Sequence, residues 1–232
     1  MSYIQEVDNS LEDLIKHGFC RLPSVKKLVD QTGVFEKCVN EMGSKTYMEG
    51  SRAQLDFLKT LGIYDNLPAK LYKIAQSKFN FSGPKTESYN VSRLVCPGDN
   101  SEGYRGHFDA HLFTLVIPVN IPSKDKKENR GQLNFFPNMR KHPRNELENV
   151  LGKIRYKKFA SENGFIKLRD RHENYIEDFL DYRPLLFIGT TTLHGNAPVD
   201  ISSSEKRLSF LSHYFDPAAY GLSAMLRKLR RR

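Results

Sequence analysis

Residues 103–120 of the chain read GYRGHFDAHLFTLVIPVN, and the rest of the sequence is interpreted outward from this stretch. It places His107 and Asp109 two positions apart, shortly before a continuous apolar run. Alternate residues of a strand point to the same side, so both side chains can reach one ion if the segment is extended. Imidazole and carboxylate groups suit an iron(II) site that keeps positions open. The pattern therefore predicts a metal site at the edge of a β-strand.

The third ligand is expected from a distant strand. His194 closes the long apolar run that begins with Leu185–Ile188, and this run reads as one buried strand. Arg207 comes thirteen residues after His194 and opens another strand-like run. A guanidinium there can hold a carboxylate through two parallel hydrogen bonds. We predict that His107, Asp109 and His194 ligate iron(II) and that Arg207 anchors a dicarboxylate co-substrate.

A His-x-Asp pair is a weak signal when it stands alone, since it is common by chance. His111 has the same strand parity as His107, so these residues could simply form a polar strand face. His111 lies roughly 13 Å from His107 along a straight strand, too far for both to be ordinary ligands of one ion. The prediction depends on the pair, the distant histidine and the arginine occurring together, each at the edge of an apolar run.

These motifs resemble the iron(II)- and 2-oxoglutarate-dependent dioxygenases, most closely their prolyl-hydroxylase-like branch. The stretch Gly131–Pro137, GQLNFFP, is similar to the Gly-Gly-x-Leu-x-x-Phe-Pro element of that branch, with Gln132 in place of the second glycine. The resemblance covers residues 86–137 and 183–216 well, and residues 11–23 loosely.

The resemblance implies Fe(II) as cofactor, 2-oxoglutarate and O2 as co-substrates, and hydroxylation of an unactivated C–H bond with release of succinate and CO2. Related halogenases replace the carboxylate ligand by a small residue, whereas Asp109 is present here. Relatives often use a tyrosine hydroxyl to help bind 2-oxoglutarate, but Pro118 stands at its place. The candidates for a replacement hydroxyl are Ser209, Tyr104 and Tyr89.

Residues 138–182 depart from the family, because prolyl hydroxylases carry a much shorter stretch between the same strands. Apolar residues recur at helical spacing in 146–154 and again in 175–180, and the first half is rich in Lys and Arg. We interpret the stretch as a helical insert, either a solvated surface feature or a lid that recognises a small, polar or acidic substrate. The candidate substrate contacts are Arg105, Asn134, Arg140, Lys141 and Arg144.

Three alternatives remain open at this point. Within the enzyme class, the chain could hydroxylate a protein residue, as prolyl hydroxylases do. Outside it, the chain could be a non-oxidative, cupin-like metal-binding protein, which would not need Arg207, or a binding module that has lost activity. The sequence does not identify the substrate or the oligomeric state.

Composition limits the partners. The chain has 232 residues and a net charge of +9, of which residues 227–232, RKLRRR, contribute five charges. This tail is expected to be a short basic amphipathic helix, packed on the body or touching an anionic membrane surface peripherally. Nucleic acid is an unlikely partner, because position 213, where nucleic-acid demethylases of this superfamily carry a second arginine, is His213. Three unpaired cysteines, no apolar leader and no run of eighteen apolar residues favour a cytoplasmic protein.

The expected fold is α+β, mainly β. Short apolar runs separated by Pro- and Gly-containing turns favour a jelly roll over βαβ units, and the resemblance implies a double-stranded β-helix. We expect a single domain with a helical front over residues 1–85, a β core over 86–137 and 183–216, the insert, and a basic tail over 217–232. Within the front, apolar spacing predicts helices at 9–17, at 24–42 with an interruption near Gly33, and at 67–78, with a short strand at 19–22.

Overall fold

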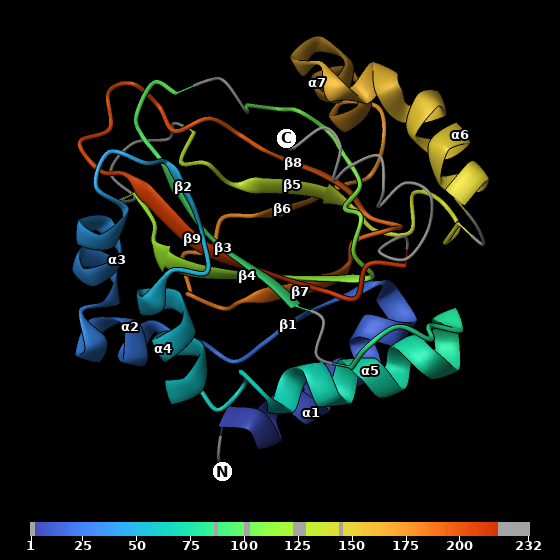
Figure 1. Cartoon of the computed structure of the whole chain (residues 1–232). Helices are drawn as coiled ribbons and strands as arrows, with labels where there is room; N and C mark the ends of the chain where they lie inside the picture. The colour runs from blue at the N-terminus through green and yellow to red at the C-terminus, as the bar shows by residue number, and fades with distance from the viewer. Residues whose placement is uncertain (1–2, 86–87, 100–102, 123–128, 144–145, 218–232) are drawn as a thin grey trace, which may run out of the picture.

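The computed structural model describes residues 3–85, 88–99, 103–122, 129–143 and 146–217, and it contains two antiparallel sheets with helices on their outer sides (Figure 1). The larger sheet has the order β1 (Phe19–Arg21), β7 (Leu185–Ile188), β4 (Phe113–Asn120), β9 (Arg207–Tyr214), β3 (Ser88–Val95) and β2 (Tyr47–Glu49). The smaller sheet has the order β6 (Tyr175–Glu177), β5 (Leu133–Phe136) and β8 (Leu193–Asn196).

The chain winds between the two sheets. It passes from β4 in the larger sheet to β5 in the smaller one, returns at β7, crosses again to β8 and comes back at β9. All the strand pairs are antiparallel. This alternation is the winding of a double-stranded β-helix, and it confirms the predicted jelly roll.

Strand alternation gives the larger sheet two different faces. In β4, the odd-numbered residues from Phe113 to Val119 are buried in the core shared with the N-terminal helices. Val116 points the other way, into a second core between the two sheets that also contains Phe135 and Phe187. Because both faces of β4 are covered, its sequence is almost continuously apolar, as expected for a central strand.

The N-terminal helices pack on the outer face of the larger sheet (Figure 1). They are α1 (Tyr3–His17), α2 (Lys26–Thr32), α3 (Val34–Met42), α4 (Arg52–Thr60) and α5 (Asn66–Phe79). The predicted helices are confirmed, including the interruption at Gly33, which has a left-handed φ of 57° between α2 and α3. Helix α4 was not predicted, although Ser51 caps it by accepting a hydrogen bond from the Gln54 amide.

The insert is helical in its first part only. It contains α6 (Glu146–Tyr156), a 3-10 turn η1 (Lys157–Ala160) and α7 (Glu162–Arg169), outside the smaller sheet (Figure 1). The helix expected at 175–180 is wrong, because Tyr175–Glu177 is strand β6 and extends the smaller sheet beside β5. Stacking of Tyr175 on Phe135, with ring centroids 5.4 Å apart, favours strand pairing over a helix. Among the described helices, none combines the length and apolarity needed to cross a bilayer.

Candidate metal centre

His107, Asp109 and His194 meet at one end of the space between the sheets. One nitrogen or oxygen atom from each lies within 4.8 Å of the others, as a shared ion requires. His107 Nε2 is 3.8 Å from Asp109 Oδ1, and His194 Nε2 is 3.6 Å from Asp109 Oδ2. The side chain of His107 is 51% exposed, whereas Asp109 and His194 are mostly covered. The group is therefore open to solvent on one side.

A pair of backbone hydrogen bonds holds the two histidines opposite each other. The His107 amide donates to the His194 carbonyl and the His194 amide donates to the His107 carbonyl, each over 3.0 Å. This isolated bridge joins the segment that enters β4 to strand β8 of the smaller sheet. Asp109 is anchored separately, since its amide donates to the Gly189 carbonyl over 3.1 Å. The predicted triad is thus assembled by contacts between distant parts of the chain.

Each of the two imidazole rings is oriented by a hydrogen bond between its Nδ1 atom and a backbone carbonyl. His107 Nδ1 is 3.0 Å from the Arg105 carbonyl, and His194 Nδ1 is 3.2 Å from the Thr192 carbonyl. A carbonyl oxygen can only accept, so each Nδ1 carries the proton and each Nε2 presents its lone pair beside Asp109. Metal-binding histidines are commonly held in this way. The donor set of two imidazole nitrogens and one carboxylate fits a divalent transition metal with open positions, such as iron(II).

Asp109 is kept ionised by its neighbours. Burial alone would raise the pKa of Asp109, but the nearby histidines His194, His213 and His107 and a hydrogen bond from Thr114 outweigh burial and hold that pKa well below its usual range. Thr114 Oγ1 donates to Asp109 Oδ2 over 2.5 Å and lies 3.1 Å from His213 Nδ1. Burial lowers the pKa of His194 to about 4. At neutral pH the site therefore contains a carboxylate beside a neutral His194, as metal binding requires.

Arg207 lies in the same cavity as the triad. This cavity, of about 110 Å³, runs between the sheets and is lined by Arg93, Val95, His107, Asp109, Thr114, Val116, Leu133, His194, Asn196, Arg207, Ser209, Leu211 and His213. Arg207 is 3% exposed, and its Nη1 donates to the Gly131 carbonyl and to Asn196 Oδ1, the latter over 3.2 Å. Gly131 has a φ of 77°, and a Cβ atom there would lie 2.7 Å from Arg207 Cδ. Glycine therefore gives Arg207 the room to reach the cavity.

No carboxylate within the described part of the chain forms an ion pair with Arg207. Burial, and then the charge of Arg93, lower the pKa of Arg207 to about 9, so the guanidinium stays charged at neutral pH. The Ser209 hydroxyl two residues further along β9 is buried without a hydrogen-bond partner. A buried cation and a free buried hydroxyl on one wall of a cavity fit an anionic ligand.

The structure does not bring the two candidate tyrosines to this cavity. The Tyr104 hydroxyl donates to Asn129 Oδ1 over 3.2 Å, and the Tyr89 hydroxyl is bonded to Glu49 and Tyr47 near the surface. Of the three predicted hydroxyl donors, only Ser209 lines the cavity. For Tyr89 the reason is its position along the strand, because it shares the parity of Arg93 and Val95 but lies near the other end of β3.

The predicted substrate contacts also lie elsewhere. The Arg105 side chain is exposed. Leu133 lines the cavity, and the next residue of the strand, Asn134, therefore points to the opposite face of the sheet. Arg140 donates to the Thr190 carbonyl over 2.6 Å and lies 4.1 Å above the Phe108 ring, so it braces the insert. Lys141 is exposed, and Arg144 lies outside the described residues. Among the described residues of 138–182, none lines the cavity, and the lid interpretation is not supported.

Sequence reasoning missed four polar residues of the cavity, namely Arg93, Thr114, Asn196 and His213. Strand parity contains the signal for two of them. His213 shares the parity of Arg207 and Ser209 on β9, and Asn196 shares that of His194 on β8. His111, set aside as a ligand, stacks with Tyr89 at 6.0 Å and does not line the cavity.

No protein-family model and no curated protein sequence matches the chain. Solved structures do match it. A prolyl-4-hydroxylase from Pseudomonas putida is 13% identical, with a TM-score of 0.52 over 89% of this chain and 97% of that one. A prolyl hydroxylase from Trichoplax adhaerens, in complex with a hypoxia-inducible-factor peptide, is 15% identical, with a TM-score of 0.53 over 91% of each chain.

The chain has the prolyl-hydroxylase fold. The α-ketoglutarate-dependent epimerase SnoN from nogalamycin biosynthesis shares this fold, with 14% identity and a TM-score of 0.52 over 92% of this chain and 84% of that one. The resemblance expected from the motifs is therefore confirmed at the level of the fold. At such low identities the activity has to be argued from the site itself.

Proposed function

We propose that the chain is an iron(II)- and 2-oxoglutarate-dependent dioxygenase that hydroxylates an unactivated C–H bond of a small molecule. One observation carries the proposal. A buried arginine without a carboxylate partner among the described residues faces the same cavity as the two histidines and the aspartate. A metal site alone would suit many proteins, but a cupin-like protein has no need for a buried cation in that place.

Each part of the cavity has a role in this proposal. His107, Asp109 and His194 would hold iron(II), which supplies the oxygen-activating chemistry when it is bound. Arg207 would pair with the distal carboxylate of 2-oxoglutarate, and the free Ser209 hydroxyl would donate to the same group. The apolar side chains Val116, Leu133 and Leu211 limit water around these charges. Succinate and CO2 would be the products of the co-substrate.

A protein-residue hydroxylase remains the second candidate. It is favoured by the fold shared with the Trichoplax adhaerens enzyme, which was solved with a peptide. It is disfavoured by residues 138–182, which depart from the sequence pattern of that branch. Assay of free small acids and of proline-containing peptides, each by substrate-stimulated succinate release, separates the two candidates.

The decisive experiment is an anaerobic titration of 2-oxoglutarate into the iron(II)-loaded protein. Chelation of the metal by the 2-oxo acid gives a weak charge-transfer band in the visible, which neither a cupin-like protein nor an inert module would show. The band should be lost in His107→Ala, Asp109→Ala and His194→Ala and kept in the matched control His111→Ala. A band that survives in His194→Ala, or one that is absent from the wild type, would refute the assignment.

A further inference from the structure

Helix α6 exposes its apolar side. Leu147, Val150, Leu151 and Ile154 are 69, 50, 56 and 63% exposed. Their spacing of three, four and seven residues puts them in one stripe along the helix. They are four of the nine large apolar side chains that are exposed in the described residues, so the feature is concentrated here.

The opposite side of α6 is the one that touches the protein. The Tyr156 hydroxyl donates to the Met139 carbonyl over 2.8 Å, and Arg140 donates to Asn149 Oδ1 over 3.1 Å. A Cβ atom at Gly152 would lie 2.7 Å from Arg140 Nη1, so the helix approaches the body closely at this point. Asn149, Gly152 and Tyr156 form one face, about half a turn away from the apolar stripe.

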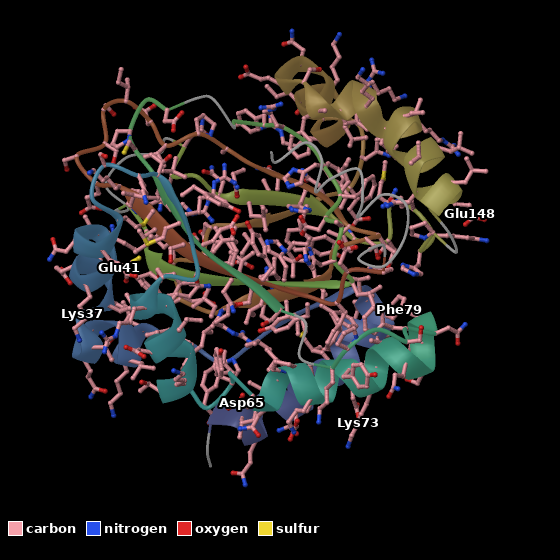
Figure 2. All side chains as sticks on the ribbon, in the orientation of Figure 1. Lys37, Glu41, Asp65, Lys73, Phe79 and Glu148 are labelled. Carbon is pink, nitrogen blue, oxygen red and sulfur yellow. The ribbon has the colours of Figure 1, made fainter. Side chains whose placement is uncertain are left out.

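The apolar stripe (Leu147, Val150, Leu151 and Ile154) therefore points outward. Helix α6 stands at the edge of the molecule, where Glu148 is labelled (Figure 2). A surface helix normally turns its apolar side to the core. This inverted orientation leaves the stripe without a partner among the described residues of the chain.

The segment that contains this stripe carries a net positive charge. Residues 140–171 contain ten Lys and Arg against four Asp and Glu, so they hold +6 of the net charge of +9. Residues 227–232 hold another +5, which leaves the remainder of the chain slightly acidic. Arg155, Lys157 and Lys158 are exposed directly after the stripe. The partner that covers the stripe should accordingly be apolar and negatively charged.

We propose that α6 is a membrane-contact element, with its apolar stripe inserted into the interface of an anionic lipid bilayer and its flanking cations on the headgroups. An amphipathic helix with an apolar side and neighbouring cations binds anionic lipid in this manner. A second copy of the chain would bring two equally basic segments 140–171 together. The chain's own basic tail would be repelled for the same reason. The proposal does not depend on the catalytic activity proposed above.

The absence of tryptophan from the chain allows a direct test. Leu151→Trp places the sole indole in the stripe, and Ile201→Trp places it at a matched control position that is 83% exposed outside α6. On mixed phosphatidylcholine–phosphatidylglycerol vesicles, the emission of the Leu151→Trp protein should shift to the blue and be quenched by brominated lipid. The Ile201→Trp protein should keep the emission of a water-exposed indole. Pure phosphatidylcholine should produce a much smaller shift.

Co-sedimentation with the same vesicles measures the contribution of the stripe. The double variant Leu151→Gln/Ile154→Gln should weaken adsorption by about tenfold or more, because it removes apolar surface that the bilayer would bury. Ile201→Gln should not weaken it, because Ile201 lies outside the stripe. Since these side chains are exposed, the Tm should be the same in the wild type and in both variants.

Equal adsorption of the stripe variant and the wild type would overturn the proposal. Loss of adsorption only on truncation after Ser223 would assign the contact to the tail. Dimerisation that disappears in the stripe variant, without any vesicle response, would assign the stripe to a second copy instead.

Discussion

Thr114 connects the candidate metal centre to the middle of the larger sheet. Its hydroxyl donates to Asp109 and lies within hydrogen-bond distance of His213, so it orients the carboxylate and is not one of the three candidate ligands. Thr114→Val keeps the branched shape but removes the hydroxyl. We expect metal affinity to fall by about 10–100-fold, as for other partners of metal ligands, and Thr114→Ser should retain it. Calorimetric titration with Co(II) tests this, and an unchanged affinity in Thr114→Val would remove Thr114 from the site.

Arg207 is the proposed anchor for the distal carboxylate of 2-oxoglutarate. Arg207→Ala should raise the 2-oxoglutarate concentration needed for half-maximal succinate formation by at least an order of magnitude. Truncating one member of a buried charge pair costs about 2–5 kcal/mol. Arg207→Lys should recover only part of the loss, since an ammonium cannot make the planar two-point contact. Metal affinity measured without 2-oxoglutarate should stay near that of the wild type, and an unchanged co-substrate requirement would contradict the assignment.

At the scale of elements, the two helices of the insert have different roles. Phe165 of α7 is fully buried in a cluster with Tyr104 and Phe108, and the Phe159 carbonyl just before α7 accepts from the Gly106 amide over 2.8 Å. Helix α7 therefore holds the segment that carries His107. Helix α6 contributes the exposed apolar stripe and, among its described side chains, no buried large one.

Unfolding in urea should separate the two helices. Phe165→Ala is expected to lower the free energy of unfolding by about 3–5 kcal/mol, because it opens a cavity in a closed cluster. The matched change Leu147→Ala, on the exposed side of the same insert, should alter that free energy by less than about 0.5 kcal/mol. A similar cost for both would show that the stripe is buried in the free protein and would contradict the surface described above.

At the scale of the whole molecule, the proposed ligands would join the two sheets. His107 and Asp109 precede β4, Arg207 lies on β9 of the larger sheet, and His194 belongs to β8 of the smaller one. Binding to the folded state alone stabilises a protein by about 2.7 kcal/mol at a ligand concentration one hundred times the Kd. In a domain of this size, each kcal/mol of added stability raises the Tm by about 2–4 °C.

The Tm measured under anaerobic conditions should therefore rise in two steps, first when Co(II) is added and again when 2-oxoglutarate is added. Arg207→Ala should keep the first increment and lose most of the second, and His194→Ala should lose both. A second increment of full size in Arg207→Ala would mean that 2-oxoglutarate is held elsewhere.

The sequence by itself determined the features that repeat within one element. Helical spacing located α1 and α5, and Gly33 marked the break between α2 and α3. Period-two alternation and the apolar runs placed His107 with Asp109 and indicated that His194 and Arg207 lie on strands. The prediction that His194 closes the strand of Leu185–Ile188 is wrong, because His194 lies on the separate strand β8 of the smaller sheet. These features depend on local geometry, which the order of residues specifies almost completely.

Only the tertiary structure decided what each face touches. Tyr175–Glu177 has a spacing compatible with a helix, but the open edge of β5 recruits it as a strand. Parity brought Ser209 and His213 to the cavity, while the hydroxyl groups of Tyr89 and Tyr104 found partners elsewhere. The apolar side of α6 was readable in the sequence, yet its outward orientation was not. Periodicity reports which side of an element is apolar, whereas the neighbours that cover that side come from distant parts of the chain.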